Sequence, residues 1–330
     1  MGWCCGCWGS AVCTAVTFHG RDGFYMGRTL DYERSFGEQV VVTPRRFPLR
    51  FRHGETLEEH YALVGMAHVA EGWPLYYDAV NEKGLGMAGL LFPESGRYGP
   101  PWPGWRNAAS FELIPWVLGR CATASEAREL LAETRVTEEG FSPALPPSPL
   151  HWLAADEKDC FAAEPTAAGL VLRDDPAGVL TNEPPLDVQL SRLRDYRALS
   201  AGDGADTFAP GLTLAAYSRG MGALGLPGDL SSPSRFVRAA FTRGNALPDY
   251  GVGQVFHILG AVAQTAGCCR VAEGFERSIY TAVWDAKRGV YYYAAYENRR
   301  LTAVDMHRTD LDGTALAVYP LRREQDVRWE

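Results

Sequence analysis

The chain has 330 residues, of which 46% are hydrophobic and 22% are charged, as in a globular protein large enough to bury its own core. A net charge of -8 argues against nucleic acid as a partner. No apolar stretch is long enough to cross a bilayer, and residues 1–12 lack the basic and leucine-rich regions of a secretory signal peptide.

Alternating apolar and polar residues predict short β-strands through the first third of the chain. These strands are residues 13–18, 24–29, 39–43, 61–67, 76–80 and 85–92. The next segment, residues 93–107, is rich in Pro, Gly and Trp, and we predict a loop over a pocket there.

Helical patterns follow, with Ser110 and Ser125 as the predicted N-caps of the first two helices. The predicted helices are residues 111–120, 126–133, 186–199, 234–243 and 252–266; the later strands are residues 151–156, 161–164, 169–173, 178–181, 278–285, 289–296 and 301–305. Strand blocks at both ends enclose helical blocks without a repeating strand–helix unit, which predicts an α+β fold. Neither a repeat nor a linker is visible, so we expect a single domain over residues 13–330.

Two glycine motifs match the dinucleotide-binding pattern G-x-G-x-x-G, at residues 84–89 and 220–225. That function needs a strand before the motif and a helix after it. The first motif runs into a strand-like segment and the second into Leu226-Pro227, so we interpret the glycines as turn and close-approach residues. Residues 216–220 nearly match the G-x-S-x-G serine elbow but lack its first glycine.

The cysteines favour free thiols in a reducing cytoplasm, because an even number of them in a long chain is not a disulfide framework. They are Cys4, Cys5, Cys7, Cys13, Cys121, Cys160, Cys268 and Cys269. The C-x-x-C spacing of Cys4 and Cys7 lacks a second pair or a nearby histidine that would complete a zinc site. His151 and His257 are candidate bases for a Cys–His pair, although a lone histidine in an apolar element is more often structural. We expect neither a metal nor an organic cofactor.

Cys13 is the most informative residue, because it opens a set of short motifs that extends to about Tyr319. The motifs are Cys13-Thr14-Ala15-Val16-Thr17-Phe18, Gly27-Arg28-Thr29-Leu30-Asp31, Asn81-Glu82-Lys83-Gly84-Leu85-Gly86, Thr181-Asn182, Gly225-Leu226-Pro227-Gly228-Asp229, Val290-Tyr291-Tyr292-Tyr293 and Tyr296-Glu297-Asn298. The set resembles the choloylglycine hydrolase family, which includes bile salt hydrolases and penicillin V acylases. The resemblance implies the N-terminal-nucleophile fold, a four-layer αββα sandwich with two antiparallel sheets.

In that family the cysteine is the first residue of the mature enzyme and attacks an amide. A free α-amine on Cys13 could then take the thiol proton, and no histidine would be needed. The resemblance implies that Arg28 stabilises the thiolate, that Asp31 holds the amine, that Asn182 donates to the oxyanion and that Arg235 lies near the nucleophile. Arg28 and Asp31 are three residues apart, so we expect a turn or bulge if both reach Cys13.

The first twelve residues are the main departure in length from this pattern. Either they are a propeptide removed by self-cleavage before Cys13, or translation starts at position 12, where valine is one reading of a GTG start codon. A second departure is Leu91, where bile salt hydrolases usually carry Asn and penicillin V acylases often carry Tyr. The backbone N–H of Leu91 is still a candidate oxyanion donor.

The resemblance supports hydrolysis of a linear amide C–N bond but does not fix the acyl group. Conjugated bile salts are the leading substrate, with penicillin V or another N-acyl amide such as an acyl-homoserine lactone as the alternative, and a catalytically silent binder of amphipathic acids as a third reading. We expect Met26, Ala67 and Phe141 to line the acyl pocket. Arg219 is predicted to pair with the sulfonate of taurine conjugates. Relatives are commonly tetramers, so a homo-oligomer is expected.

Overall fold

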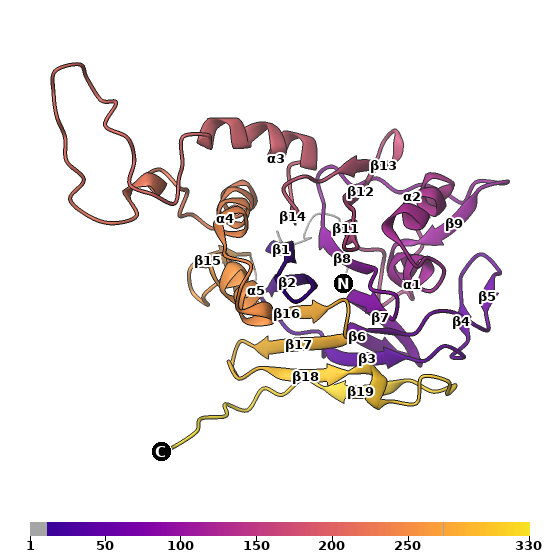
Figure 1. Cartoon of the computed structure of the whole chain (residues 1–330). Helices are drawn as coiled ribbons and strands as arrows, with labels where there is room; N and C mark the ends of the chain where they lie inside the picture. The colour runs from indigo at the N-terminus through magenta and orange to yellow at the C-terminus, as the bar shows by residue number, and fades with distance from the viewer. Residues whose placement is uncertain (1–11, 273) are drawn as a thin grey trace.

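The structure is a computed structural model that describes residues 12–272 and 274–330 (Figure 1). Within this part of the chain, two large antiparallel sheets lie face to face and helices cover the outer face of each. This arrangement confirms the α+β class and the αββα sandwich. The candidate leader, residues 1–11, lies outside the described residues.

The first sheet carries Cys13 on an inner strand, β1, which pairs with β14 on one side and β2 on the other. Its strand order is β14-β1-β2-β16-β17-β18, with β15 pairing separately with β16. The strands are β1 (Val12–His19), β2 (Phe24–Tyr32), β14 (Val179–Leu180), β15 (Cys269–Val271), β16 (Gly274–Asp285), β17 (Val290–Ala295) and β18 (Thr302–Asp305).

The second sheet has the order β13-β12-β11-β8-β7-β6-β3-β19. Its strands are β3 (Gln39–Thr43), β6 (Leu63–Ala70), β7 (Trp73–Asn81), β8 (Gly86–Leu91), β11 (Leu150–Ala155), β12 (Cys160–Thr166), β13 (Gly169–Asp174) and β19 (Ala317–Pro320). Short pairs form at β4 (Leu49–Arg50) with β5 (Thr56–Leu57) and, in parallel, at β9 (Arg106–Ala109) with β10 (Thr134–Thr137).

The helices divide between the two outer faces. α1 (Leu113–Leu118) and α2 (Ala124–Ala132) pack on the second sheet, whereas α4 (Ser232–Asn245) and α5 (Gly251–Gly260) pack on the first. α5 buries Val255, Ile258 and Leu259, which share one face at helical spacing. The other helical elements are α3 (Leu186–Arg192), η1 (Ser110–Glu112), η2 (Leu193–Tyr196), η3 (Met221–Ala223) and η4 (Met306–Arg308).

The sheets approach each other closely, and this explains part of the first glycine motif. A Cβ atom at Gly86 would lie 2.5 Å from Nε1 of Trp284 in the facing sheet. Gly84 has a φ of +92° in the turn before β8, and Gly220 and Gly225 also adopt positive φ values. These glycines therefore serve turns and close packing, as interpreted from the sequence.

Both predicted helix caps are wrong. Ser110 lies inside η1, and Ala109 precedes that element. Thr123, not Ser125, caps α2 by accepting from the backbone N–H of Glu126 at 3.2 Å. Propensity favours several neighbouring hydroxyl residues about equally, so the cap is decided by where the helix packs.

Residues 197–231 leave the body of the molecule as a long segment between η2 and α4 (Figure 1). Phe208, Tyr217 and Leu224 in this segment are largely exposed. Among the helices that the structure describes, none combines the length and apolar character that crossing a membrane requires.

Candidate active site

Cys13 lies near the start of β1 and is only 2% exposed. It pairs directly with Leu30 of β2, so its side chain shares a face of the sheet with Leu30 and Arg28. The structure brings Arg28 and Asp31 of the neighbouring strand, and the remote Asn182 and Arg235, around this residue. The sequence-predicted catalytic set therefore meets at a single place.

Asn182 joins the backbone of Cys13 to the second sheet. Its Oδ1 accepts from the backbone nitrogen of Cys13 at 2.7 Å and from Nη2 of Arg235 at 3.0 Å. Its Nδ2 donates to the carbonyl oxygen of Leu91 at 2.8 Å. Because Cys13 and Arg235 offer only donors here, the amide orientation of Asn182 is determined. One of its Nδ2 hydrogens is left for a further acceptor.

Arg235 holds the Cys13 segment from the helix side of the first sheet. It projects from α4 and is fully buried, and its Nη1 donates to the carbonyl oxygen of Cys13 at 2.6 Å and to Oγ1 of Thr14 at 2.5 Å. Burial lowers the pKa of Arg235 to about 10, although Asp31 and Cys13 oppose this change. The guanidinium is therefore still charged at neutral pH.

Arg28 lies on the opposite side, between the sheets. Its Nη1 donates to the carbonyl oxygens of Gly89 at 2.9 Å and Tyr77 at 3.3 Å, and its Nε donates to that of Thr29. Its Nη2 is buried and has no hydrogen-bond partner among the described residues. An unsatisfied buried donor is costly, so this atom is an available donor for an anion beside Cys13.

Asp31 reaches the site without the distortion expected in its strand. β2 keeps an unbroken register with β1 from Phe24 to Asp31, and Asp31 lies opposite Val12. The irregularity falls in β16 instead, between Ser278 and Tyr280. Arg28 and Asp31 point to opposite faces and approach the start of β1 from its two sides. The expectation of a turn or bulge in β2 is therefore wrong.

The Asp31 carboxylate accepts hydrogen bonds from Oγ of Ser278 at 2.5 Å and Oγ1 of Thr29 at 2.9 Å. Burial raises the pKa of the Asp31 carboxyl group to about 6, and the charge of Arg235 and these hydroxyl groups oppose the rise. The carboxylate is therefore mostly ionised at neutral pH. Because Asp31 lies opposite Val12, it would stabilise a positively charged group at that position.

Burial holds the Cys13 thiol in its protonated form. It raises the pKa of the thiol above the usual value, and the charge of Arg28 is the largest opposing influence. The Asp31 carboxylate adds to the rise, whereas its backbone N–H and Arg235 counteract it. Arg28 acts in the expected direction but is outweighed. A thiol in this environment needs a nearby base to become nucleophilic at neutral pH.

Sequence reasoning missed a buried acidic group behind Arg28. Asp78 in β7 is fully buried and accepts from Oη of Tyr280 at 2.6 Å and Oη of Tyr291 at 2.5 Å. Its Oδ2 lies 3.9 Å from Nη1 of Arg28. Burial raises the pKa of Asp78, with Arg28 and the tyrosines opposing. The only sequence signal was a lone aspartate in an otherwise apolar strand.

The Tyr291→Phe variant is expected to lower the free energy of unfolding by about 1–3 kcal/mol, because Asp78 loses a donor while staying buried. Tyr292→Phe is the matched control, since Tyr292 lies next in β17 on the opposite, partly exposed face. Urea denaturation of both variants measures the difference. Equal midpoints would contradict a stabilising role for the Tyr291 hydroxyl group.

Leu91 lies at the end of β8, where its carbonyl oxygen accepts from Asn182. This contact brings the Leu91 backbone beside the amide of Asn182. Its role as an oxyanion donor through the backbone N–H stays a prediction.

The residues predicted to bind substrate are scattered. Met26 is fully buried in the core between the sheets, on the face of β2 that carries Arg28, whereas Ala67 packs in the second core with the outer helices. Phe141 packs edge-to-face against Phe111, with ring centroids 5.4 Å apart. Arg219 lies in the projecting segment, where its side chain is 97% exposed and pairs with Asp203 at 3.2 Å. The described contacts of Ala67, Phe141 and Arg219 do not reach Cys13.

In the contacts that the structure describes, neither candidate histidine base reaches Cys13. Nε2 of His151 lies 2.8 Å from the carbonyl oxygen of Thr181, and His257 is exposed on α5. In the residues that the structure describes, no group of His, Cys, Asp and Glu side chains has an arrangement that would hold a metal ion. Cys4 and Cys7 lie outside those residues. The described cysteines, Cys13, Cys121, Cys160, Cys268 and Cys269, are free thiols.

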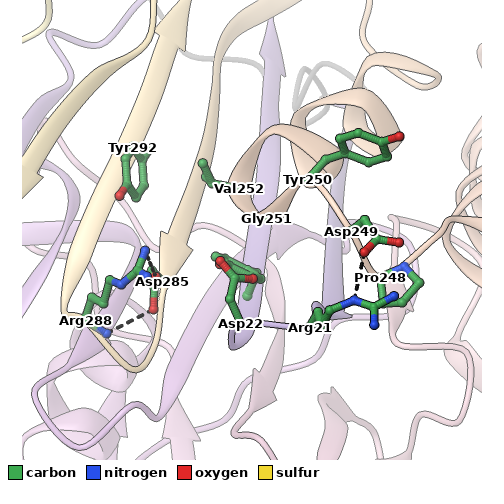
Figure 2. Close-up of a pocket in the computed structure, with 11 residues that line it drawn as sticks. Arg21, Asp22, Pro248, Asp249, Tyr250, Gly251, Val252, Asp285, Arg288 and Tyr292 are labelled. Atoms are coloured by element: carbon green, nitrogen blue, oxygen red, sulfur yellow. Dashed lines mark hydrogen bonds and ion pairs between the residues drawn. The ribbon is translucent and has the colours of Figure 1, made fainter.

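A cavity of about 410 Å³ lies at the other end of β1 and β2, away from Cys13 (Figure 2). Its lining is strongly charged, but most of the charges pair with one another: Arg21 with Asp249 at 2.8 Å and Arg288 with Asp285 at 3.5 Å. None of the residues around Cys13 lines it. The predicted catalytic residues therefore gather at the start of β1 and not in this cavity.

Comparison with known proteins shows similarity along nearly the whole chain. A family model described as linear amide C-N hydrolases, choloylglycine hydrolase family, matches residues 13–319. The chain is 46% identical over 318 residues to a bile salt hydrolase/transferase of Lactiplantibacillus plantarum, covering 95% of this chain and 98% of that protein.

Solved structures give the same picture. A mutant of the conjugated bile acid hydrolase from Clostridium perfringens matches with a TM-score of 0.91 and 31% identity, covering 96% of this chain and 99% of that chain. Penicillin V acylase from Agrobacterium tumefaciens matches with a TM-score of 0.74 at 20% identity over 92% of this chain and 90% of that one, a likeness of fold alone. These similarities confirm the resemblance drawn from the motifs.

Proposed function

Because the chain belongs to the choloylglycine hydrolase family of linear amide C–N hydrolases, we propose that it cleaves the amide bond of glycine- or taurine-conjugated bile salts, with Cys13 as the nucleophile. The observation that carries this proposal is the convergence of Arg28, Asp31, Asn182 and Arg235 on Cys13. Similarity to a bile salt hydrolase/transferase and a conjugated bile acid hydrolase supports the substrate class.

In the proposed mechanism, the mature chain begins at Cys13 and its free α-amine takes the thiol proton. The thiolate attacks the amide carbonyl carbon, and the C–S bond forms as the carbonyl oxygen becomes an oxyanion. Nδ2 of Asn182 and the backbone N–H of Leu91 stabilise that charge. Arg28, whose Nη2 is unpartnered among the described residues, stabilises the thiolate, and Asp31 holds the protonated amine.

Collapse of the oxyanion breaks the C–N bond, and the α-ammonium group gives its proton to the departing glycine or taurine nitrogen. The acyl group is then a thioester of Cys13. The α-amine next removes a proton from water, which attacks the thioester, and breaking the C–S bond releases the free acid and restores the thiol. No metal or organic cofactor is needed for any of these steps.

The start of the mature chain is part of the proposal. Cys13 lies at the first matched residue of the family model, and its nitrogen already contacts Oδ1 of Asn182. Residues 1–12 are then either a removed propeptide or a start-site error, and residues 13–330 form a single domain around the paired sheets. The free thiols of the described cysteines favour a cytoplasmic location.

We also propose a homo-oligomer, a tetramer as the family resemblance implies. The support is the segment at residues 197–231, which projects from the body and exposes Phe208, Tyr217 and Leu224 (Figure 1). A second copy of the chain would remove these apolar side chains from water. A solution mass equal to that of one chain would contradict this proposal.

The test of function is amine release from taurocholate, glycocholate and penicillin V by protein that begins at Cys13. Rapid release from the bile salts is expected. Release from penicillin V alone would assign the acylase activity and implicate Leu91. Inactivity with all of these substrates, together with rapid alkylation of Cys13, would indicate another acyl amide such as an acyl-homoserine lactone, whereas an unreactive thiol would favour a silent binder.

The preference for taurine over glycine is tested by Arg219→Ala. If Arg219 pairs with the sulfonate, the variant lowers the ratio of taurocholate to glycocholate turnover. An unchanged ratio would refute the preference. Loss of the exposed pair with Asp203 is expected to change the free energy of unfolding by less than about 1 kcal/mol, so the ratio can be read in a folded protein.

A further inference from the structure

The two proposed donors to the oxyanion, Asn182 and Leu91, belong to different sheets, so contacts between the sheets must fix the distance between them. Asn182 follows β14 of the first sheet, and Leu91 ends β8 of the second. They are 91 residues apart in the chain and meet through the bond from Nδ2 of Asn182 to the Leu91 carbonyl oxygen. An oxyanion site built in this way depends on contacts that hold the sheets in register.

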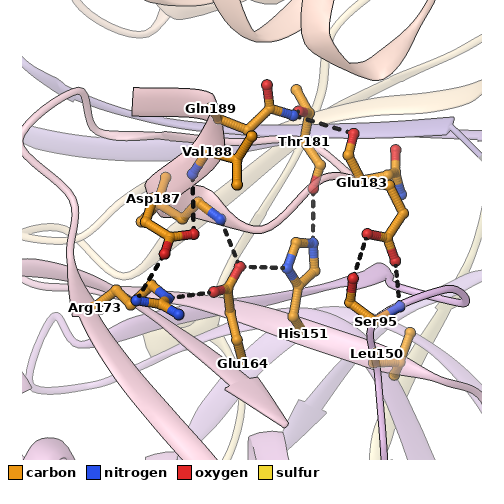
Figure 3. Close-up of polar contacts among 12 residues, drawn as sticks. Ser95, Leu150, His151, Glu164, Arg173, Thr181, Glu183, Asp187, Val188 and Gln189 are labelled. Carbon is orange, nitrogen blue, oxygen red and sulfur yellow. Dashed lines mark hydrogen bonds and ion pairs between the residues drawn. The ribbon is translucent and has the colours of Figure 1, made fainter. Parts of the chain in front are cut away.

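His151 provides such a contact. It lies in β11, which pairs with β8, and is fully buried. Its ring stacks on Phe92, the residue after Leu91, with centroids 4.2 Å apart and planes 6° from parallel. Its Nε2 lies 2.8 Å from the carbonyl oxygen of Thr181, the residue before Asn182 (Figure 3). A carbonyl oxygen only accepts, so Nε2 carries the hydrogen.

A carboxylate on the other side fixes the orientation of this ring. Oε1 of Glu164 lies 3.4 Å from Nδ1 of His151 and accepts from the backbone N–H of Leu186 at 2.9 Å (Figure 3). Oε2 accepts from Nε of Arg173 at 2.8 Å. Burial alone would raise the pKa of Glu164, but its bonds to His151, Leu186 and Arg173 leave the pKa below its usual value. The ring is therefore held by an ionised partner and has little freedom to rotate.

A second tie lies on the far side of Asn182. The Glu183 carboxylate accepts from the backbone N–H groups of Glu94 at 2.9 Å and Ser95 at 2.8 Å, and from Oγ of Ser95 at 2.8 Å (Figure 3). Glu183 is thus bound directly to the segment that follows Leu91, and Thr181 is bound to the His151 ring that stacks on Phe92 in that segment.

We infer that His151 is a positioning residue that holds Asn182 against the Leu91 backbone and thereby sets the geometry of the oxyanion site. This inference rests on the proposed function. His151 does not reach the reacting atoms; it acts on them through Thr181 and Phe92. A merely structural histidine would change stability, whereas a positioning histidine changes the rate of the step that forms an oxyanion.

The test compares His151→Phe with His60→Phe in protein that begins at Cys13. Phenylalanine keeps a ring against Phe92 but loses the donor to Thr181. His60 is also buried, and its ring nitrogens lie at the carbonyl oxygens of Tyr61 and Phe47, away from Cys13. We expect His151→Phe to lower kcat about 10- to 100-fold, since small displacements of a catalytic group have effects of that size. His60→Phe is expected to keep kcat.

Three measurements separate positioning from loss of fold. Alkylation of Cys13 by iodoacetamide forms no oxyanion, so its rate should be the same in His151→Phe and the parent. Combined with Asn182→Ala, His151→Phe should lower kcat little further, because it acts through Asn182. His151→Gln, which retains an N–H donor, should recover part of kcat. If His151→Phe does not fold, the same cycle with His151→Gln decides the matter.

The inference is overturned if His151→Phe keeps the parental kcat, if the losses in the double variant multiply, or if His60→Phe is equally slow. Hydrogen exchange supplies a measure that is independent of activity. Backbone amides in residues 92–96 and 181–183 should exchange faster in His151→Phe than in His60→Phe. If the parent releases no amine but His151→Phe still exchanges faster than His60→Phe in these segments, the proposed function is refuted and the positioning role remains. If the two variants exchange equally, the positioning role is refuted.

Discussion

The Cys13→Ala variant is expected to hydrolyse amides about 10⁴-fold or more slowly than the parent, since loss of a nucleophile leaves only binding and oxyanion stabilisation. The thiol is the group on which Arg28, Asp31 and Arg235 act, and alanine offers no atom in its place. Release of glycine or taurine from conjugated bile salts, followed over hours to capture a slow residual rate, measures the loss.

Cys121→Ala is the matched control. Cys121 is also a buried free thiol, but it packs in the second core beneath the outer helices. We expect this variant to keep its kcat and to lose only stability. Binding of substrate to Cys13→Ala, measured by calorimetry, should persist because the substitution removes only the sulfur atom of Cys13. Substantial turnover by Cys13→Ala would remove the thiol from the mechanism.

Protein that retains residue 12 is expected to be about 10²- to 10⁴-fold slower than protein that begins at Cys13, the range typical of general acid–base groups. In the peptide-bonded chain the Cys13 nitrogen is an amide that donates to Oδ1 of Asn182. An amide nitrogen has no basic lone pair, whereas a free α-amine has a pKa of about 7.7 to 8.0. Burial favours the protonated thiol, so the proposed mechanism needs a base, and the free α-amine is the base that it assigns.

The comparison needs intact mass for each preparation, because self-cleavage would convert one form into the other. Val12 lies opposite Asp31. When residue 12 is retained, it therefore occupies the position beside Asp31 that the α-ammonium group of Cys13 would approach. The pH dependence of kcat should show the loss of one basic group when residue 12 is retained. Equal rates for two forms of verified mass would contradict the role of the amine.

Much of the fold followed from the sequence because its signals are local. Alternation predicted most strands in the first third of the chain, and the order of strand and helix blocks predicted the α+β class. The features that the sequence predicted wrongly, or did not predict, depend on contacts between distant segments. Ser110 and Ser125 are good caps in isolation, but packing begins the helices elsewhere. β19 pairs with β3 across nearly the entire chain, and its short, partly exposed segment carries little periodicity.

The candidate site divides in the same way. Cys13, Arg28, Asp31, Asn182 and Arg235 were identified from motifs, and the structure brings them together. Asp78 and His151 have no motif, since their roles come from partners that only the folded chain supplies. Arg28 and Asp31 reach Cys13 from opposite faces of an undistorted strand, which spacing along a single strand does not reveal.

Cys13 contacts Asn182 and Arg235, which lie 169 and 222 positions further along the chain. Synthesis proceeds from the N-terminus, so the proposed nucleophile is made early and its partners late. In a nascent chain Cys13 therefore lacks the environment of the folded site, which is complete only after α4 has packed on β1. Every fragment that ends before Arg235 lacks part of the site, so ribosome-bound and truncated chains are expected to be inert toward amides. Turnover of an amide substrate, and not alkylation of Cys13, therefore reports the completion of folding.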